Sequence, residues 1–309
     1  MGQIKNKSKL LIIGGSGFIG KNLTRKALNE GFQVTILSIN EIPKEEVIDE
    51  VDYLRANILE TKFDVENKIK DFEYVVNLSG YVNHSSFLIE GDEVIDVHFG
   101  GLRNILKVLQ WGKLKRFVQI GSSDEYGNQP APQKEHYKED PISPYALAKT
   151  ASSYLLQMLA RTEKFPAVIL RLFLVYGPEQ KHDRFMPQII NGCLSNKDFA
   201  TSYGEQYRDF CYIDDVSDAI LKSLKAENVV GEIINIASGN RILIREVIEK
   251  ISSFIGKGNP RFGEIGYRAG ENLELYADIS KAKKLLNWTP STSIDEGIVK
   301  TIKYFHDKL

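Results

Sequence analysis

Short apolar runs alternate with amphipathic stretches along much of the chain. The runs cover residues 10–13, 33–37, 51–54, 74–78, 116–120 and 167–170. Most are apolar at successive positions, as expected of parallel strands covered on both faces. Residues 94–109 instead show the helical spacing of apolar positions, and Ser143 with Pro144 forms a typical start for a helix that runs to about Arg161. This alternation predicts an α/β fold with a Rossmann doubly wound parallel sheet.

The pattern changes after Pro178, where mixed loops and short helices replace the regular alternation. We therefore expect a Rossmann domain in residues 1–177 and a smaller mixed α/β lobe in residues 178–207 and 238–309 that binds the substrate. Residues 208–237 are expected to return to the first domain, with 210–224 and 233–236 rejoining its main sheet.

Composition and charge exclude several classes of protein. The 309 residues are 42% hydrophobic and 26% charged, an ordinary globular balance, and the net charge of −1 gives no reason to expect a nucleic acid or an anionic membrane as partner. Cys193 and Cys211 lack paired spacing, which argues against disulfides and zinc, so no metal is expected. No run is long enough to span a membrane, and the polar N-terminus lacks the apolar centre of a signal peptide. A cytoplasmic protein is expected.

A glycine-rich turn follows the first apolar run. Gly14 allows a tight turn, Gly17 lets the backbone approach a pyrophosphate, and Gly20 allows the following helix to pack closely. The start of that helix supplies amide donors and the positive end of its dipole. Strand, glycines and helix together predict a dinucleotide site.

The spacing Gly-x-x-Gly-x-x-Gly resembles that of the extended short-chain dehydrogenase/reductase family, the NAD-dependent epimerases and dehydratases. Ser38 stands where many NAD enzymes of this fold carry an acidic residue, yet no arginine follows it to hold a 2′-phosphate, so we expect NAD, with NADP as the alternative. The glycine turn, the ends of the following strands and the family resemblance together identify the residues expected to contact the cofactor. They are Gly14, Ser16, Gly17, Phe18, Ile19, Gly20, Ser38, Asn57, Ile58, Leu78, Ser79, Gly80, Tyr145 and Lys149.

Tyr145 and Lys149 share one face of the predicted helix because they are four residues apart. A nearby ammonium lowers the pKa of a phenol, so that Tyr145 can exchange a proton with a substrate hydroxyl as hydride moves at the same carbon. Ser123, rather than Ser122, is expected to hydrogen-bond the reacting oxygen. Tyr304 and Lys308 repeat the spacing without the strand-end serines or the glycine turn, so we take them as a chance match.

The order of motifs across nearly the whole chain resembles the nucleotide-sugar-modifying branch of the family. This resemblance implies a nucleoside-diphosphate sugar as partner, chemistry at C4 of the hexose, and a role in polysaccharide or glycan building blocks. It also implies that Arg208 and Arg268 hold the diphosphate or ribose, and that Arg184 and Pro187 line the nucleotide pocket.

Asp124 and Glu125 distinguish the reactions open to this branch. In 4,6-dehydratases such a pair serves as acid and base, but the loop here is one residue shorter and looks more like that of GDP-4-keto-6-deoxymannose reductases. The main prediction is therefore an NAD(P)-dependent oxidoreductase acting at C4, either a 4-keto reductase or a 4-dehydrogenase. A 4,6-dehydratase using Asp124 and Glu125, a 4-epimerase, and a nucleotide-sensing scaffold without catalysis remain as alternatives.

Two apolar helix faces suggest self-association. They lie on residues 94–109 and on a stripe of the helix after Pro144, formed by Tyr154, Leu155, Met158 and Leu159. In enzymes that the chain resembles, the equivalent helices pair across a dimer. The resemblance therefore implies a homodimer.

Overall fold

A parallel sheet organises the larger of two lobes in the computed structural model, which describes residues 7–60, 65–267 and 271–308. Within these residues the sheet has seven strands in the order β11-β6-β5-β4-β1-β2-β3. Each neighbouring pair is parallel, and the order reverses beside β1. The strands are β1 (Lys9–Ile13), β2 (Gln33–Ser38), β3 (Val51–Arg55), β4 (Tyr74–Asn77), β5 (Arg116–Ser122), β6 (Ala167–Leu172) and β11 (Ile233–Ile236). The predicted doubly wound fold is confirmed.

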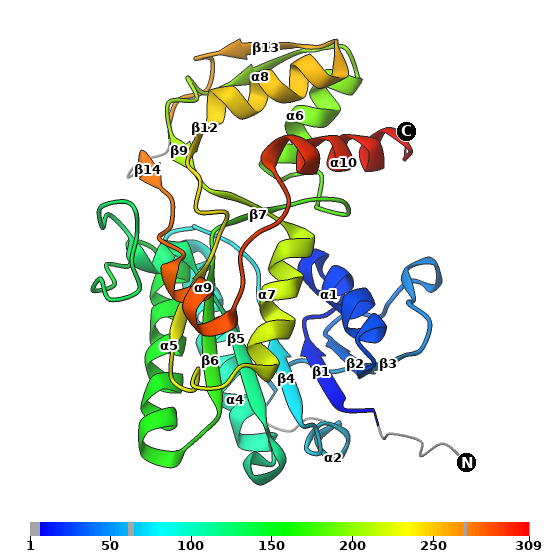
Figure 1. Ribbon diagram of the computed structural model, residues 1–309, viewed down its shortest axis with the longest axis vertical. Coiled ribbons are helices and arrows are strands. Elements are labelled where there is room, and N and C mark those ends of the chain that lie inside the picture. The colour runs from blue at the N-terminus through cyan, green and yellow to red at the C-terminus, as the bar shows by residue number, and fades with distance from the viewer. Residues whose placement is uncertain (1–6, 61–64, 268–270, 309) are drawn as a thin grey trace.

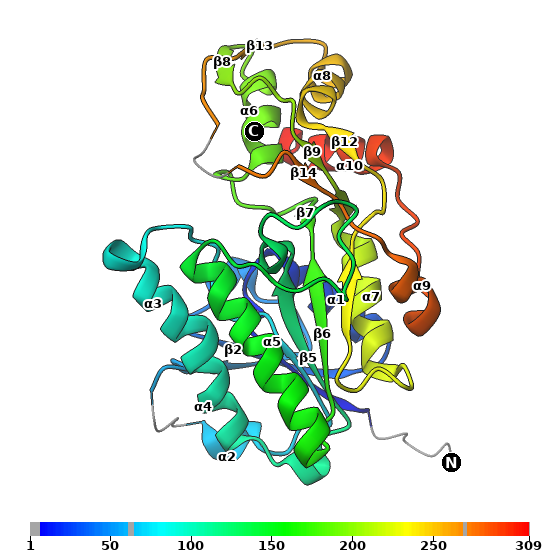
Figure 2. The same ribbon diagram turned by 90° about the vertical axis from the view of Figure 1, so that its left-hand side faces the viewer.

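Helices cover both faces of this sheet, which explains why its strands read as continuous apolar runs. In β1, Leu10 and Ile12 face the core under one set of helices, and Leu11 and Ile13 face the core under the other. The first face is covered by α1 (Phe18–Asn29) and α7 (Ile213–Lys225). The second is covered by α2 (Glu66–Ile69), α4 (Gly101–Val108) and α5 (Pro144–Glu163), as Figure 2 shows for the two longer helices.

The two helices beside the predicted catalytic residues form where the sequence indicated. Ser143 caps α5 by accepting a hydrogen bond from the Ala146 amide at 3.1 Å. The predicted 94–109 helix lies within a longer helical segment made of η2 (Phe87–Gly91), α3 (Asp92–Ile95), η3 (Asp96–Gly100) and α4. η2 and η3 have the wider turn of a π-helix, a feature frequent at functional sites.

The smaller lobe sits above the carboxyl ends of the strands (Figure 1). It packs α6 (Phe185–Leu194), α8 (Ile244–Ile255) and α10 (Ile294–His306) around one apolar core. Two strand pairs and one three-stranded sheet accompany them. The pairs are β7 (Leu174–Tyr176) with β10 (Phe210–Tyr212) and β8 (Asp198–Thr201) with β13 (Asn259–Phe262), and the sheet consists of β9 (Tyr207–Arg208), β12 (Ile242–Leu243) and β14 (Glu274–Leu275). Among the described helices, none combines the length and apolar character that a membrane span requires.

Two boundaries differ from the prediction. Phe210–Tyr212 does not rejoin the main sheet: it pairs with β7, which continues the chain beyond the end of β6, while α7 and β11 do return as expected. In addition, α9 (Ser280–Leu286) and Trp288 belong to the core of the larger lobe rather than the smaller one. The Trp288 indole donates a hydrogen bond to the Asp215 carbonyl at 3.1 Å, which holds this part of the chain against α7 in the larger lobe.

Candidate active site

The backbone of the glycine turn lies in close contact with the backbone at the end of β4. Gly14 has a φ of +75°, a conformation that side chains disfavour, and its amide donates to the Leu37 carbonyl at 2.8 Å. A Cβ on Gly14 would lie 3.0 Å from the Leu78 carbonyl group and from the Ser79 Cα. The turn therefore brings the carboxyl ends of β1, β2 and β4 together, where ligands bind in open α/β sheets.

The start of α1 can receive an anion. Gly17 is its N-cap and carries no side chain to cap it, so the first amides remain available to a phosphate. A Cβ on Gly20 would lie 2.4 Å from the Gly15 backbone, which means that this glycine packs against the turn rather than the sheet. Phe18 and Ile19 pack partly against the core of the smaller lobe, so α1 starts where the two lobes meet.

The end of β2 shows how the ribose side of the site is built. The Ser38 and Ser16 hydroxyls lie 2.9 Å apart, and Ser38 also accepts a hydrogen bond from the Asn40 amide at 3.2 Å. Arg55 donates to the Ile39 carbonyl at 3.3 Å. Sequence reasoning missed this cation because Arg55 reaches the end of β2 from the neighbouring strand.

The remaining predicted cofactor residues line the adjacent strand ends. Asn57 accepts the Leu59 amide at 3.0 Å in a tight turn, and the Ile58 carbonyl accepts a hydrogen bond from Asn104 on α4 at 3.0 Å. The Ser79 hydroxyl donates to the Asn77 side chain at 2.6 Å. These contacts fix the backbone beside the glycine turn, so the geometry fits a dinucleotide along this edge.

Tyr145 and Lys149 meet beside the end of β5. The Lys149 ammonium donates to the Ile120 carbonyl at 2.9 Å and lies 5.7 Å from the centre of the Tyr145 ring. Burial lowers the pKa of Lys149 to about 8, although Glu125 and Asp124 act to raise it. Burial and the charge of Asp124 raise the pKa of Tyr145 above that of a free phenol. The phenol is therefore a weaker acid here than in water, although the Arg184 charge acts to lower its pKa.

The hydroxyl that acts on the Tyr145 phenol belongs to Ser122, whereas the sequence favours Ser123. The Ser122 side chain accepts the Asp124 amide at 3.2 Å and acts to lower the pKa of Tyr145, against the larger effect of burial. Ser123 is the buried first residue of η5 (Ser123–Tyr126). β5 extends through Ser122, two residues beyond the predicted run 116–120, so Ser122 still belongs to the strand and Ser123 begins the following turn.

Two histidines that the sequence did not single out pack on the Tyr145 ring. His98 lies edge-on at 5.1 Å between ring centres, and His84 lies edge-on at 5.7 Å. Burial and the Lys149 charge lower the pKa of His98 to about 3, so its ring is neutral and its Nε2 donates to the Tyr81 carbonyl at 2.9 Å. Both are isolated histidines, and no spacing in the sequence marks them.

Glu125 cannot serve as the base of a dehydratase. Its carboxylate is fully buried in an ion pair with Arg171 at 2.9 Å and accepts a hydrogen bond from Ser153 at 2.9 Å. The prediction that Glu125 could act as the base of a dehydratase is therefore wrong, because its carboxylate is turned into the protein and cannot reach a substrate proton. Asp124 is partly exposed, with an oxygen 3.7 Å from His84 Nε2, and its charge acts on Tyr145.

The predicted substrate residues come from the smaller lobe. Arg208 is nearly buried, donates to the Tyr207 carbonyl at 2.9 Å and forms an ion pair with Glu271. Arg184 precedes α6, and its charge acts on Tyr145, whereas Pro187 is buried within α6. Arg268 lies outside the described residues.

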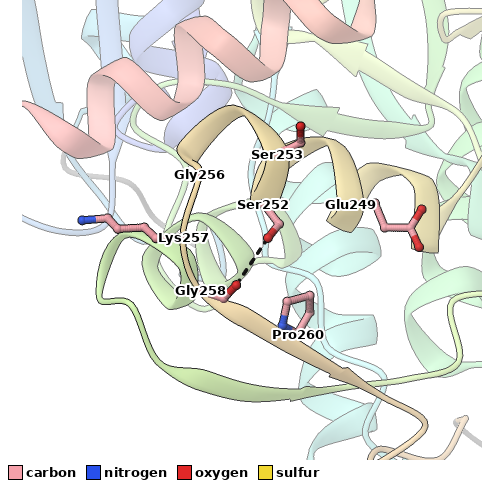
Figure 3. A pocket seen from close by; sticks show the side chains of 7 residues that line it. All are labelled: Glu249, Ser252, Ser253, Gly256, Lys257, Gly258 and Pro260. Carbon is pink, nitrogen blue, oxygen red and sulfur yellow. Dashed lines mark hydrogen bonds between the residues drawn. The ribbon is translucent and has the colours of Figure 1, made fainter.

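A separate hollow lies at the far end of the smaller lobe (Figure 3). It has a volume of about 320 Å³ and is lined by Glu249, Ser252, Ser253, Gly256, Lys257, Gly258 and Pro260. None of these residues belongs to the predicted site. The hollow therefore plays no part in the chemistry discussed below.

Comparison with known proteins places this geometry in context. The sequence profile of the NAD dependent epimerase/dehydratase family matches residues 10–237. A UDP-glucuronate 4-epimerase from Thermodesulfobacterium geofontis (strain OPF15) is 30% identical, covering 97% of this chain and 96% of the relative. A UDP-N-acetyl-alpha-D-glucosaminuronate decarboxylase from Bacillus cytotoxicus is 27% identical, with 97% and 98% covered.

A solved structure agrees over the whole chain. The crystal structure of UDP-glucuronic acid 4-epimerase from Bacillus cereus, in complex with UDP-glucuronic acid and NAD, has a TM-score of 0.88 and 27% identity, covering 97% of this chain and 100% of that one. The similarities extend through both lobes and so include the Tyr145 region. They do not support the special resemblance to GDP-4-keto-6-deoxymannose reductases that the short loop suggested.

Proposed function

Because the chain belongs to the NAD dependent epimerase/dehydratase family, we propose that it is a nucleotide-sugar 4-epimerase that uses NAD and acts on a UDP-linked hexose or hexuronate. The observation that carries the proposal is the meeting of Tyr145, Lys149 and Ser122 at the end of β5, beside the glycine turn. This replaces net oxidation or reduction as the favoured reaction.

The residues of the chain supply proton transfer and orientation. Ser122 and Tyr145 hold the 4-hydroxyl of the sugar, and Tyr145 takes its proton and later returns it. Lys149 favours the phenolate that this step requires. NAD, when bound, supplies a hydride acceptor and donor for C4. Inversion follows when the sugar presents its other face before the hydride returns.

The fixed position of Glu125 supports epimerisation over dehydration. A 4,6-dehydratase needs two carboxylates that reach C5 and C6, and of the pair only Asp124 retains solvent exposure. An epimerase needs neither, since the same phenol serves both halves of its reaction. The 4-epimerases among the similar proteins favour the same choice.

Arginines of the smaller lobe are suited to the nucleotide part of the substrate. We assign Arg208 to the diphosphate of the substrate, which would bind the guanidinium together with its present partner Glu271 or in place of it. Arg184 is assigned to the nucleotide or sugar near Tyr145, because its charge already acts on that phenol. Arg268 stays a sequence-based proposal.

The exposed apolar surface supports a homodimer. Leu147, Tyr154 and Met158 form one stripe of α5, and they are 48%, 48% and 39% exposed. Leu88 and Ile89 in η2, which packs against α5, are 92% and 75% exposed. A monomer would leave this patch in water, so a second copy is the proposed partner.

The proposal is tested by incubating the protein with UDP-glucuronic acid, UDP-glucose and UDP-N-acetylglucosamine, with and without added NAD. Proton NMR should show the C4 epimer of at least one sugar, without net change in nicotinamide absorbance. Tyr145→Phe should abolish the conversion while NAD still binds. Loss of water from the product would instead indicate a dehydratase, and stoichiometric NADH would indicate a dehydrogenase.

A further inference from the structure

The Glu125 carboxylate takes no part in proton transfer, yet it contacts each element that carries the proposed chemistry. Its Oε1 accepts the Ser122 amide at 2.9 Å, at the end of β5. Its Oε2 accepts the Ser153 hydroxyl of α5 at 2.9 Å and the Nε and Nη2 of Arg171, on β6, at 3.0 and 2.9 Å. A single buried side chain thus joins β5, α5 and β6.

The contact with Ser153 lies on the active face of α5. Tyr145, Lys149 and Ser153 are spaced four residues apart, so their side chains follow one another along one side of the helix. Because Glu125 also holds the Ser122 amide, it sets the distance between the serine and the helix that presents the phenol. The space it uses is narrow: a Cβ on Gly121 would lie 2.5 Å from Glu125 Oε1.

The carboxylate is also an electrostatic neighbour of the buried amine. Its charge acts to raise the pKa of Lys149, against the larger effect of burial, and Asp124 acts in the same direction from the exposed side. The other charged or titratable groups around these two include Tyr145 and Tyr154 on α5, His98 on η3, Tyr126 in η5, and Arg171 on β6 with its second partner Glu139. His98 is neutral, and Arg171 is paired.

We propose that Glu125 is a positioning residue of the active site: its hydrogen bonds to the Ser122 amide and the Ser153 hydroxyl fix Ser122 against the face of α5 that carries Tyr145 and Lys149, and they hold its negative charge one helical turn from Lys149, where it favours the ammonium form. This role deepens the 4-epimerase proposal and rests on it for its catalytic consequence. The electrostatic part concerns Lys149 alone and holds whatever the substrate proves to be.

Glu139 provides a matched control. It also pairs with Arg171 in a nearly buried position, and it accepts the Tyr154 hydroxyl at 2.5 Å. It is not among the groups that act on Lys149. Replacing Glu139 therefore weakens the same ion-pair network without removing the charge beside the amine.

The experiment compares Glu125→Gln, Glu125→Asp and Glu139→Gln with the unmodified protein. Lysine labelled with ¹³C at Cε reports the Lys149 pKa by NMR titration, and Lys149→Arg assigns its resonance. Thermal unfolding and steady-state turnover of the sugar complete the set. The titration needs no substrate, so it decides the electrostatic claim even if the chain is not an epimerase.

Glu125→Gln should lower the Lys149 pKa by on the order of one unit and lower kcat at least tenfold with little change in KM. Glu125→Asp, which keeps the charge but shortens the reach, should lower kcat while the Lys149 pKa stays near that of the unmodified protein. Glu139→Gln should lower the melting temperature without moving that pKa.

An unchanged Lys149 pKa in Glu125→Gln, or an equal shift in Glu139→Gln, would overturn the electrostatic claim. If Glu125→Gln does not fold, Ser153→Ala tests the tether alone. If the unmodified protein is an active epimerase, Ser153→Ala should lower kcat several-fold and leave KM unchanged. Full activity in folded Ser153→Ala would overturn the positioning claim.

Discussion

Ser122 ends β5 and Ser123 begins η5, so the side chains of these two adjacent serines lie in different surroundings. Both are buried, and the Ser122 side chain acts to lower the pKa of the Tyr145 phenol. The sequence favours Ser123 as the partner of the reacting oxygen. The tertiary structure instead favours Ser122, because its side chain acts on the Tyr145 phenol.

Ser122→Ala should lower kcat for epimerisation by about 10²-fold, because one donor to the reacting oxygen is lost. Ser123→Ala should change kcat only a few-fold, since Ser122 is the serine whose side chain acts on the Tyr145 phenol. Steady-state kinetics of both variants on the same sugar nucleotide provide the comparison. The opposite ranking would restore Ser123 to the role that the sequence predicted.

The buried amine predicts how turnover depends on pH. Burial lowers the pKa of Lys149 to about 8, so the ammonium is lost as the pH rises through that value. Without it the phenolate of Tyr145 is less favoured, and kcat should fall on the alkaline side. A pH profile of kcat should therefore show a limb near pH 8, and Lys149→Arg, whose guanidinium stays charged, should lack it even at reduced activity.

Gly80, just after β4, packs directly against His98 of the helical segment that follows. Gly80 has a φ of +99°, and a Cβ there would lie 2.1 Å from the His98 ring. His98 comes from the wide turn η3 and packs on Tyr145. Gly80 was expected to give a cofactor room, and the structure adds a second reason for it: the histidine ring occupies that space.

Gly80→Ala should lower the free energy of unfolding by about 1–3 kcal/mol, because both backbone strain and the clash with His98 act against the folded state. Gly112→Ala is the matched control, since its Cβ would meet nothing within 4 Å and its φ is ordinary. Urea denaturation followed by circular dichroism measures both. Equal stability of the two variants would show that the His98 ring moves aside without cost.

The two lobes meet at the start of α1, and the surface proposed for a second copy lies on the face of the larger lobe that α5 covers. Figure 2 shows α3, α4 and α5 together on one face of the sheet. The exposed stripe of α5 lies on this face, away from the glycine turn. Leu159, which the sequence assigned to the stripe, is buried against the sheet instead, and Leu155 is partly buried there.

Leu147→Glu should convert a dimer into a monomer, because it adds a charge to the centre of the apolar patch. Val299→Glu on α10 is the control: Val299 is 51% exposed but lies on the other lobe, so the dimer should persist. Sedimentation velocity at micromolar concentration distinguishes the two. A monomeric unmodified protein would remove the proposed dimer altogether.

Local sequence determined the strands, the glycine turn, the cap of α5 and the shared face of Tyr145 and Lys149, because each depends on neighbouring residues or on helical periodicity. The long-range contacts had to come from the tertiary structure. They turn Glu125 toward Arg171, bring Arg55 to the end of β2, place His84 and His98 on the phenol, and return α9 to the larger lobe. Such contacts join residues far apart in the chain and follow from packing, to which no local spacing corresponds.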